Sequence, residues 1–123
     1  MSNTTGDKEK AIELECITPI LYVKNVAVSV DYYINRLGFK KEWDWGDPPN
    51  FASVSRDDFP ILLCEGGQGQ PGTWLWIGVS DTDAIYEEFK ARGAEIRETP
   101  TNYPWAYELR VEDPDGHILR FGS

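Results

Sequence analysis

The chain has 123 residues and a formal net charge of −9, from 12 basic and 21 acidic side chains. This length fits one compact domain. The negative charge argues against binding to duplex nucleic acid or to an anionic membrane surface, because both would repel the protein. Apolar residues make up 41% of the chain and include five Trp, six Tyr and five Phe, which is enough to build a folded core.

Other sequence features narrow the class of protein further. No apolar run approaches the roughly 20 residues needed to span a bilayer, and the first 15 residues contain no apolar segment typical of a secretory signal. The two cysteines, Cys16 and Cys64, are too few for a dense disulfide framework, and we expect both to be small buried side chains. We therefore predict an acidic, cytoplasmic, single-domain protein.

The same order of elements is predicted twice along the chain. Residues 1–10 are polar and aperiodic, so we expect a flexible tail before a single domain over 11–123. The first half, about 15–65, is predicted to contain strand Cys16–Val23, a helix capped by Asn25 and ended by Gly38, and strands Phe39–Trp45, Phe51–Ser55 and Pro60–Cys64. The second half, about 73–123, is predicted to contain strand Trp74–Val79, a helix capped by Asp81 or Asp83 and ended by Gly93, and strands Glu95–Arg97, Ala106–Glu112 and His117–Phe121.

The sequence DPDG at 113–116 predicts a tight hairpin between the last two strands. Such a turn places Arg120 opposite Arg110 and diagonal to Glu108. Apolar residues alternate with these three, so the three share a face that meets water or lines a wet cavity. An arginine inside a cavity needs a counter-charge, and Glu108 is the partner that the hairpin offers. His117, the only histidine, follows the turn, and we expect it to be a surface or half-buried residue.

Three segments of the chain resemble a known superfamily. The run DPDGHILRF resembles the closing hairpin of the vicinal oxygen chelate superfamily, the glyoxalase/bleomycin-resistance/dioxygenase group. The opening ITPILYVKNVAVSVDYYINRLGF resembles its first strand and helix, and WLWIGVSDTDAIYEEFKARGAEI resembles the start of its second module. The resemblance implies an α+β fold of two βαβββ modules with curved mixed sheets. It also implies a homodimer with cavities between modules of the two chains.

Many members of the superfamily hold a divalent metal with His, Gln or Glu at four positions, and the resemblance identifies the equivalent positions in this chain. These places fall on Thr18, near Leu62, on Trp74 and on Arg120. None of these side chains suits zinc, nickel, iron or manganese, and Arg120 would add a permanent positive charge. We therefore predict no metal site and no cofactor. No nucleophile motif accompanies the single histidine, so we identify no residue for nucleophilic catalysis.

Tryptophans dominate the candidate binding site. Strand alternation places Trp74 and Trp76 on one face and Trp43 and Trp45 on another, while Trp105 leads into the strand of Glu108. The alternative is that these rings only fill the core or a dimer interface. The candidate ligand-binding residues are Trp43, Trp45, Trp74, Trp76, Trp105, Glu108 and Arg120.

The resemblance is nearest to the bleomycin-resistance-like branch, which lacks the metal site and sequesters its ligand. It implies a non-catalytic protein that binds a small molecule, with a Trp-lined acidic cavity for a cationic or aromatic ligand. A bleomycin-like cation is one candidate. The alternative is a glyoxalase-like lyase or isomerase, or a dioxygenase-related enzyme, with a displaced or absent metal site.

Overall fold

The computed structural model describes residues 11–123, which form two helices and eight strands. In chain order these are β1 (Ile20–Val23), α1 (Val26–Leu37), β2 (Lys40–Gly46), β3 (Pro49–Arg56), β4 (Phe59–Glu65), β5 (Trp74–Gly78), α2 (Thr82–Arg92), β6 (Glu95–Asn102), β7 (Tyr107–Glu112) and β8 (Ile118–Gly122). The predicted flexible tail, 1–10, lies outside the described residues. Within 11–123, neither helix has the length and apolar character needed to cross a membrane.

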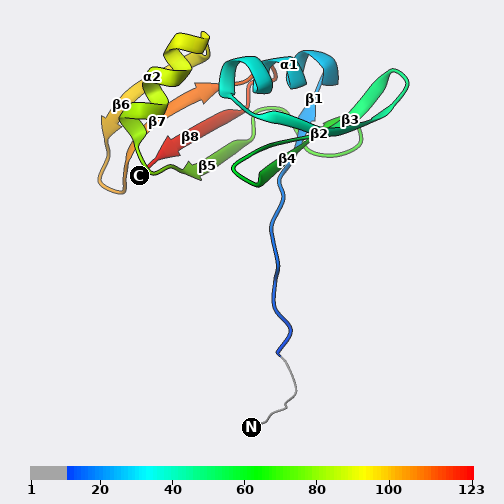
Figure 1. Cartoon of the computed structure of the whole chain (residues 1–123), viewed down its shortest axis with the longest axis horizontal. Helices are drawn as coiled ribbons and strands as arrows, with labels where there is room; N and C mark the ends of the chain where they lie inside the picture. Colours follow the sequence, from blue (N-terminus) through cyan, green and yellow to red (C-terminus); the bar gives the residue numbers. More distant parts are fainter. Residues whose placement is uncertain (1–10) are drawn as a thin grey trace.

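The strands form two sheets of identical topology. Sheet A has the order β1-β4-β3-β2, and sheet B has the order β5-β8-β7-β6. In each sheet the first and last strands of the module pair in parallel, and the other neighbours pair antiparallel. This confirms the predicted α+β fold of two βαβββ modules with mixed sheets. Both helices lie on the same side of the two sheets (Figure 1), so each sheet has a helix-covered face and an open face.

The helices begin and end where the sequence predicts. The side chain of Asn25 accepts a hydrogen bond from the backbone N–H of Val28 at 3.1 Å, and Gly38 ends α1 in the left-handed conformation with φ 75°. In α2 the cap is Asp81 rather than Asp83, and Gly93 ends the helix with φ 78°. Both modules therefore use the same local signals to turn from helix back into sheet.

The core lies between the helices and the covered faces of the sheets. Tyr33 and Leu37 of α1 and Phe89 of α2 are completely buried there, and the ring of Phe89 meets that of Phe121 edge-on at 4.9 Å. Along β7 and β8 the predicted apolar residues Leu109, Val111, Leu119 and Phe121 lie in the core, whereas Tyr107, which was predicted with them, is only partly buried. The intervening polar residues consequently face away from the helices.

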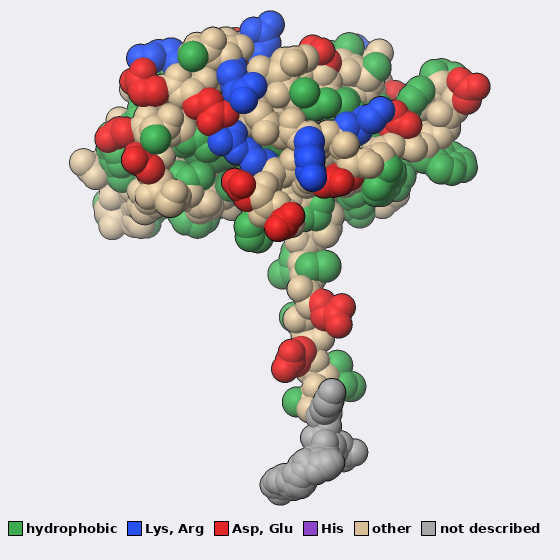
Figure 2. All heavy atoms as spheres, in the orientation of Figure 1, with side chains coloured by type: hydrophobic (Ala, Val, Ile, Leu, Met, Phe, Trp, Pro, Cys, Tyr) green, Lys and Arg blue, Asp and Glu red, His purple; other side chains and the backbone are tan. Residues whose placement is uncertain are grey.

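The first strand is shorter than predicted. It begins at Ile20 rather than Cys16, and its ladder with β4 starts where the backbone N–H of Leu62 donates to the carbonyl of Pro19. Pro19 has no N–H to continue a ladder. Residues 11–17 therefore extend away from the body on the open side of the sheets (Figure 1), with hydrophobic and acidic side chains along the segment (Figure 2). Cys16 is exposed, so the prediction of its burial was wrong, whereas Cys64 is buried as expected.

His117 is fully buried, contrary to the prediction of a surface or half-buried residue. Its Nδ1 accepts a hydrogen bond from the backbone N–H of Thr73 at 2.9 Å, and its Nε2 lies 2.6 Å from the carbonyl oxygen of Tyr22. These partners select the neutral imidazole with its proton on Nε2. The DPDG turn places the ring where the starts of β5 and β8 meet β1, so the ring satisfies backbone groups of both modules.

Candidate functional site

The polar residues of β7 and β8 converge on the open face of sheet B with the tryptophans of β5. Arg120 is the register partner of Trp76 in β5 and of Arg110 in β7. This confirms the predicted pairing of the two arginines across the hairpin. Glu108 lies two residues before Arg110 on the same face, and Trp74 lies two residues before Trp76.

Glu108 is the centre of this cluster and is completely buried. Its Oε2 accepts hydrogen bonds from Nε of Arg120 at 2.8 Å and from Nε of Arg110 at 3.2 Å. Its Oε1 accepts from Nη2 of Arg120 at 3.1 Å, from the indole N–H of Trp105 at 3.1 Å and from that of Trp76 at 3.3 Å. One carboxylate therefore fixes four side chains from β5, β7, β8 and the segment before β7.

The charges around Glu108 decide its protonation state. The hydrogen bonds from Arg120 lower the pKa of Glu108 to about 2, with further lowering from Trp105 and Arg110, although burial opposes the change. In return, Glu108 raises the pKa of Arg120. Glu108 is thus ionised and saturated with donors at neutral pH, which leaves it no proton to give and little capacity to accept one.

Two glycines make room for this arrangement. A Cβ at Gly122 would lie 2.8 Å from Cβ of Glu108 and 3.4 Å from the indole nitrogen of Trp76. A Cβ at Gly78 would lie 3.2 Å from the ring of Trp76. Side chains at these positions would displace the indole or the carboxylate, so the bare backbone of β5 and β8 is part of the site.

Aromatic rings enclose the two guanidinium groups. Cζ of Arg110 lies 4.8 Å from the ring centroid of Tyr103 and 5.5 Å from that of Trp74. Cζ of Arg120 lies 5.9 Å from the ring centroid of Trp105. The rings of Tyr103 and Trp105 stack in parallel, with centroids 4.9 Å apart and planes 10° from parallel. The two arginines therefore bind both the buried carboxylate and the π faces of the surrounding rings.

This cluster leaves a large aromatic surface uncovered. Trp74 is 55% exposed, Trp76 50% and Trp105 60%. Rings with this much exposure add little to the core of the chain, and their role in ligand binding stays a prediction. We call Trp74, Trp76, Tyr103, Trp105, Glu108, Arg110 and Arg120 the indole–arginine face.

Trp43 and Trp45 lie elsewhere, in β2 at the edge of sheet A. Trp43 packs edge-on against Phe51, with ring centroids 5.3 Å apart, and both tryptophans are exposed. Within residues 11–123 neither makes an aromatic contact with the tryptophans of sheet B. A single chain therefore brings together five of the seven predicted site residues and leaves these two on the other sheet.

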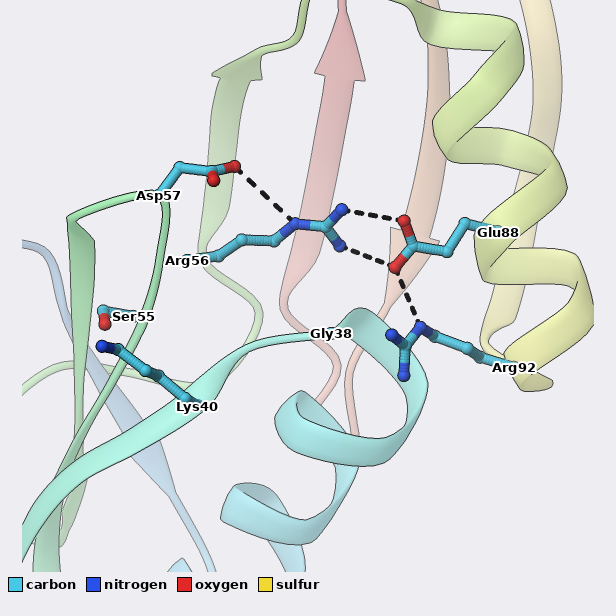
Figure 3. Close-up of a pocket in the computed structure, with 7 residues that line it drawn as sticks. All are labelled: Gly38, Lys40, Ser55, Arg56, Asp57, Glu88 and Arg92. Atoms are coloured by element: carbon cyan, nitrogen blue, oxygen red, sulfur yellow. Dashed lines mark hydrogen bonds and ion pairs between the residues drawn. The ribbon is translucent and has the colours of Figure 1, made fainter.

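A cavity of about 340 Å³ lies at the junction of the two modules (Figure 3). Arg56 of β3 makes a two-pronged ion pair with Glu88 of α2, and Nε of Arg92 donates to the same carboxylate at 2.9 Å. Arg56, Asp57, Glu88 and Arg92 of the lining are thus already paired with one another, and Lys40 is paired with Glu42 outside it. The geometry fits a clamp between module one and α2 better than a ligand site.

The four places that the resemblance assigns to metal ligands do not form a ligand set in this chain. Thr18 precedes β1, Leu62 lies in β4, Trp74 begins β5, and Arg120 is bound to Glu108. Threonine, leucine, tryptophan and arginine offer no imidazole or carboxylate to a cation. Among the described residues, no group of three or more His, Cys, Asp or Glu side chains is placed to hold a metal ion.

Sequence reasoning missed Tyr103 as a member of the face and left Arg110 out of the binding set. Arg110 was placed on the correct side of the hairpin by alternation, so the signal for it was present. Tyr103 lies in the irregular segment NYPWA, where no periodicity indicates orientation. Its position depends on its stacking against Trp105, a contact that only the folded chain provides.

Comparison with known proteins places this fold in a family. The model of the Glyoxalase/Bleomycin resistance protein/Dioxygenase superfamily matches residues 16–121. The structure of TioX from Micromonospora sp. ML1 is similar with a TM-score of 0.78 and 19% identity, over 88% of this chain and 97% of that one. TnmS3, an antibiotic-binding protein from Streptomyces sp. CB03234, gives a TM-score of 0.76 and 22% identity, over 93% of this chain and 98% of that one.

A further similar structure is the bleomycin-binding protein of bleomycin-producing Streptomyces verticillus in complex with copper(II)-bleomycin. Its TM-score is 0.72 and its identity 27%, over 90% of this chain and 97% of that one. No curated protein sequence matches this chain. The family match covers most of the chain, and the two-module topology agrees with it. The chain therefore belongs to the glyoxalase/bleomycin resistance protein/dioxygenase superfamily.

Proposed function

We propose that this protein binds a small organic molecule on the indole–arginine face and makes or breaks no covalent bond. The proposal rests on one observation, the combination of exposed indoles and a fully paired carboxylate on this face. Of three half-exposed indoles, those of Trp76 and Trp105 donate to a carboxylate that is buried, ionised and fully hydrogen-bonded, and that of Trp74 lies against Arg110. Such a surface combines exposed aromatic area for stacking with a few fixed polar groups, which is the usual character of a small-molecule site.

The enzyme alternative needs a group that can move a proton. Glu108 is the carboxylate at the centre of the face, and its pKa of about 2 is far from the value of a general acid or base at neutral pH. The positions used for metal ligands hold Thr18, Leu62, Trp74 and Arg120. Neither route to a lyase, isomerase or dioxygenase has a residue in the described chain that favours it.

The similar structures support a binding role. One is an antibiotic-binding protein and another holds copper(II)-bleomycin. Bleomycin therefore remains one candidate ligand for this chain, and a cytoplasmic location remains our prediction. Between the two predicted ligand classes, the arrangement of rings gives stronger support to an aromatic than to a cationic molecule, because Arg110 and Arg120 already occupy ring faces.

We also propose that the protein is a homodimer. Each sheet has an open face with exposed aromatic side chains, Trp43 and Trp45 on sheet A and the indole–arginine face on sheet B. A second copy covering these faces would bring all seven predicted residues to one cavity and exclude water from it. Sedimentation at micromolar concentration should give about twice the chain mass of 14.0 kDa; a monomer would contradict this part of the proposal.

The function is tested by titrating chelator-treated protein and following its tryptophan fluorescence. The ligands are metal-free bleomycin and a set of three-ring aromatic compounds. We expect saturable binding of at least one compound, with about one site per chain and a Kd in the micromolar range or below. Binding should weaken by about tenfold or more in Trp74→Ala, because stacking area is lost.

Phe59→Ala is the matched control for this titration. Phe59 is also a large exposed aromatic residue, but it lies at the β3–β4 turn rather than on the indole–arginine face. Its removal should leave affinity unchanged. Equal loss in Trp74→Ala and Phe59→Ala, or no binding by any compound, would contradict a ligand site on this face.

A further inference from the structure

The proposed binding function does not specify the charge of the ligand. The contacts of Arg110 and Arg120 indicate which charge the face favours. Arg110 lies within cation–π distance of both Trp74 and Tyr103, and Arg120 lies within that distance of Trp105. Tyr103 and Trp105 also cover each other. Trp74, Tyr103 and Trp105 therefore each already contact one of the protein's own cations, and Tyr103 and Trp105 also contact each other, whereas the ring of Trp76 has no such contact among the described residues.

The negative charge of the face is likewise used internally. Glu108 is buried and accepts five hydrogen bonds from four side chains. Glu98 lies 3.5 Å from Nη1 of Arg110, and it raises the pKa of the Tyr103 hydroxyl through a hydrogen bond. A cation arriving at this face would meet two guanidinium groups without gaining an accessible carboxylate that lacks a partner.

Donor groups, by contrast, remain available. Arg110 and Arg120 keep 22% and 25% of their side-chain surface exposed. In the part of the chain that the structure describes, Nη2 of Arg110 and Nη1 of Arg120 have no hydrogen-bond partner. Guanidinium N–H groups at the edge of an aromatic surface are well suited to carboxylate, phenolate or carbonyl oxygens.

Resting on the proposed function, we infer that the indole–arginine face selects planar aromatic molecules bearing an anionic or carbonyl oxygen and discriminates against planar cations of the same size. The exposed parts of Trp74, Trp76 and Trp105 supply the stacking surface. Arg110 and Arg120 supply donors to the oxygen at the ligand's edge. The net charge of −9 for the whole chain, which taken alone suggests a cationic ligand, does not describe the local charge of this face.

The inference is tested with two three-ring probes of nearly equal area, anthracene-9-carboxylate and the cation 9-aminoacridine, by isothermal titration calorimetry at one ionic strength. We expect the carboxylate to bind at least about tenfold more tightly to the natural protein. In Arg110→Gln the ratio should fall by about tenfold or more, because an edge donor is lost and the ring faces of Trp74 and Tyr103 become free for a cation.

Arg110→Lys keeps a positive charge and should retain part of the preference. Thermal unfolding of both variants establishes that they are folded. If Arg110→Gln does not fold, the inference is decided by the ratio of the two probe affinities in Arg110→Lys and in the natural protein. Equal or tighter binding of 9-aminoacridine to the natural protein would overturn the inference while the binding function stands. Failure of both probes and of metal-free bleomycin to bind would overturn the inference and the proposed function together.

Discussion

Sheet A and sheet B have the same topology but very different open faces. Counting back five residues from the helix caps Asn25 and Asp81 reaches Ile20 in β1 and Trp76 in β5. Their register partners are Leu62 and Arg120. The registers of the next strand pairs match further positions of the two sheets. Ser53 is equivalent to Arg110, Phe51 to Glu108, and Cys64 to Gly122.

The fold thus supplies two equal scaffolds, and only one of them holds a polar cluster. In sheet A the position of Glu108 is taken by Phe51, whose ring packs against Trp43 without any need for hydrogen-bond partners. In sheet B the carboxylate at that position is buried, so it needs hydrogen-bond donors from the side chains around it. The first two predictions test how completely sheet B depends on these hydrogen bonds.

The largest effect is expected from Glu108→Ala. It leaves Arg110 and Arg120 without their buried counter-charge and two indole N–H groups without an acceptor. We expect the free energy of unfolding to fall by about 3–5 kcal/mol. Urea unfolding measures the change, and Glu87→Gln on the exposed surface of α2 is the control, with an expected change near zero. Similar losses in both variants would mean that the cluster does not hold sheet B together.

The loss of stability in acid should include a contribution from the protonation of Glu108. The folded pKa of Glu108 is lowered to about 2 from an ordinary value of 4.5, so its contribution is complete above pH 4.5 and is lost as the pH falls towards 2. The difference in unfolding free energy between the natural protein and Glu108→Gln should therefore be constant above about pH 5 and shrink below it. Chemical denaturation at a series of pH values tests this, and a difference independent of pH down to 3 would contradict it.

The junction between the two sheets depends on His117. His117→Leu removes the acceptor of the Thr73 N–H and the partner of the Tyr22 carbonyl, both of them partly buried groups. We expect a loss of about 1–3 kcal/mol in unfolding free energy. His117→Gln, which can still reach one of the two groups, should lose less. If the leucine variant is as stable as the natural protein, the imidazole is not needed to join β1 to β5.

Much of this fold could be predicted from local signals. Asn25 and Asp81 start the helices, Gly38 and Gly93 end them, and the DPDG turn fixes the register that pairs Arg110 with Arg120. Each of these signals acts over a few residues, which is why sequence reasoning finds it. The pairing of Glu108 with Arg120 followed from that register, because a buried arginine needs a counter-charge and the hairpin offers one.

The rest depends on contacts between distant segments. His117 is buried because Thr73 and Tyr22 reach it across 44 and 95 positions of sequence, which no local pattern shows. Cys16 is exposed because no strand of the described chain pairs with the apolar run before Pro19. Trp43 and Trp45 lie in sheet A, as the predicted strand Phe39–Trp45 of the first half implies, so a single chain does not bring them to the tryptophans of sheet B.

The smallest effect is expected where the two modules are clamped by charge. Glu88 joins Arg56 of module one to Arg92 of α2, and each partner is about one third exposed. Glu88→Gln should therefore lower the free energy of unfolding by only about 0.5–1 kcal/mol, and less in high salt because partly exposed ion pairs are screened. Urea unfolding at low and high salt measures both numbers. A loss as large as that of Glu108→Ala would mean that the charged junction, rather than the cluster in sheet B, dominates the polar stabilisation of this fold.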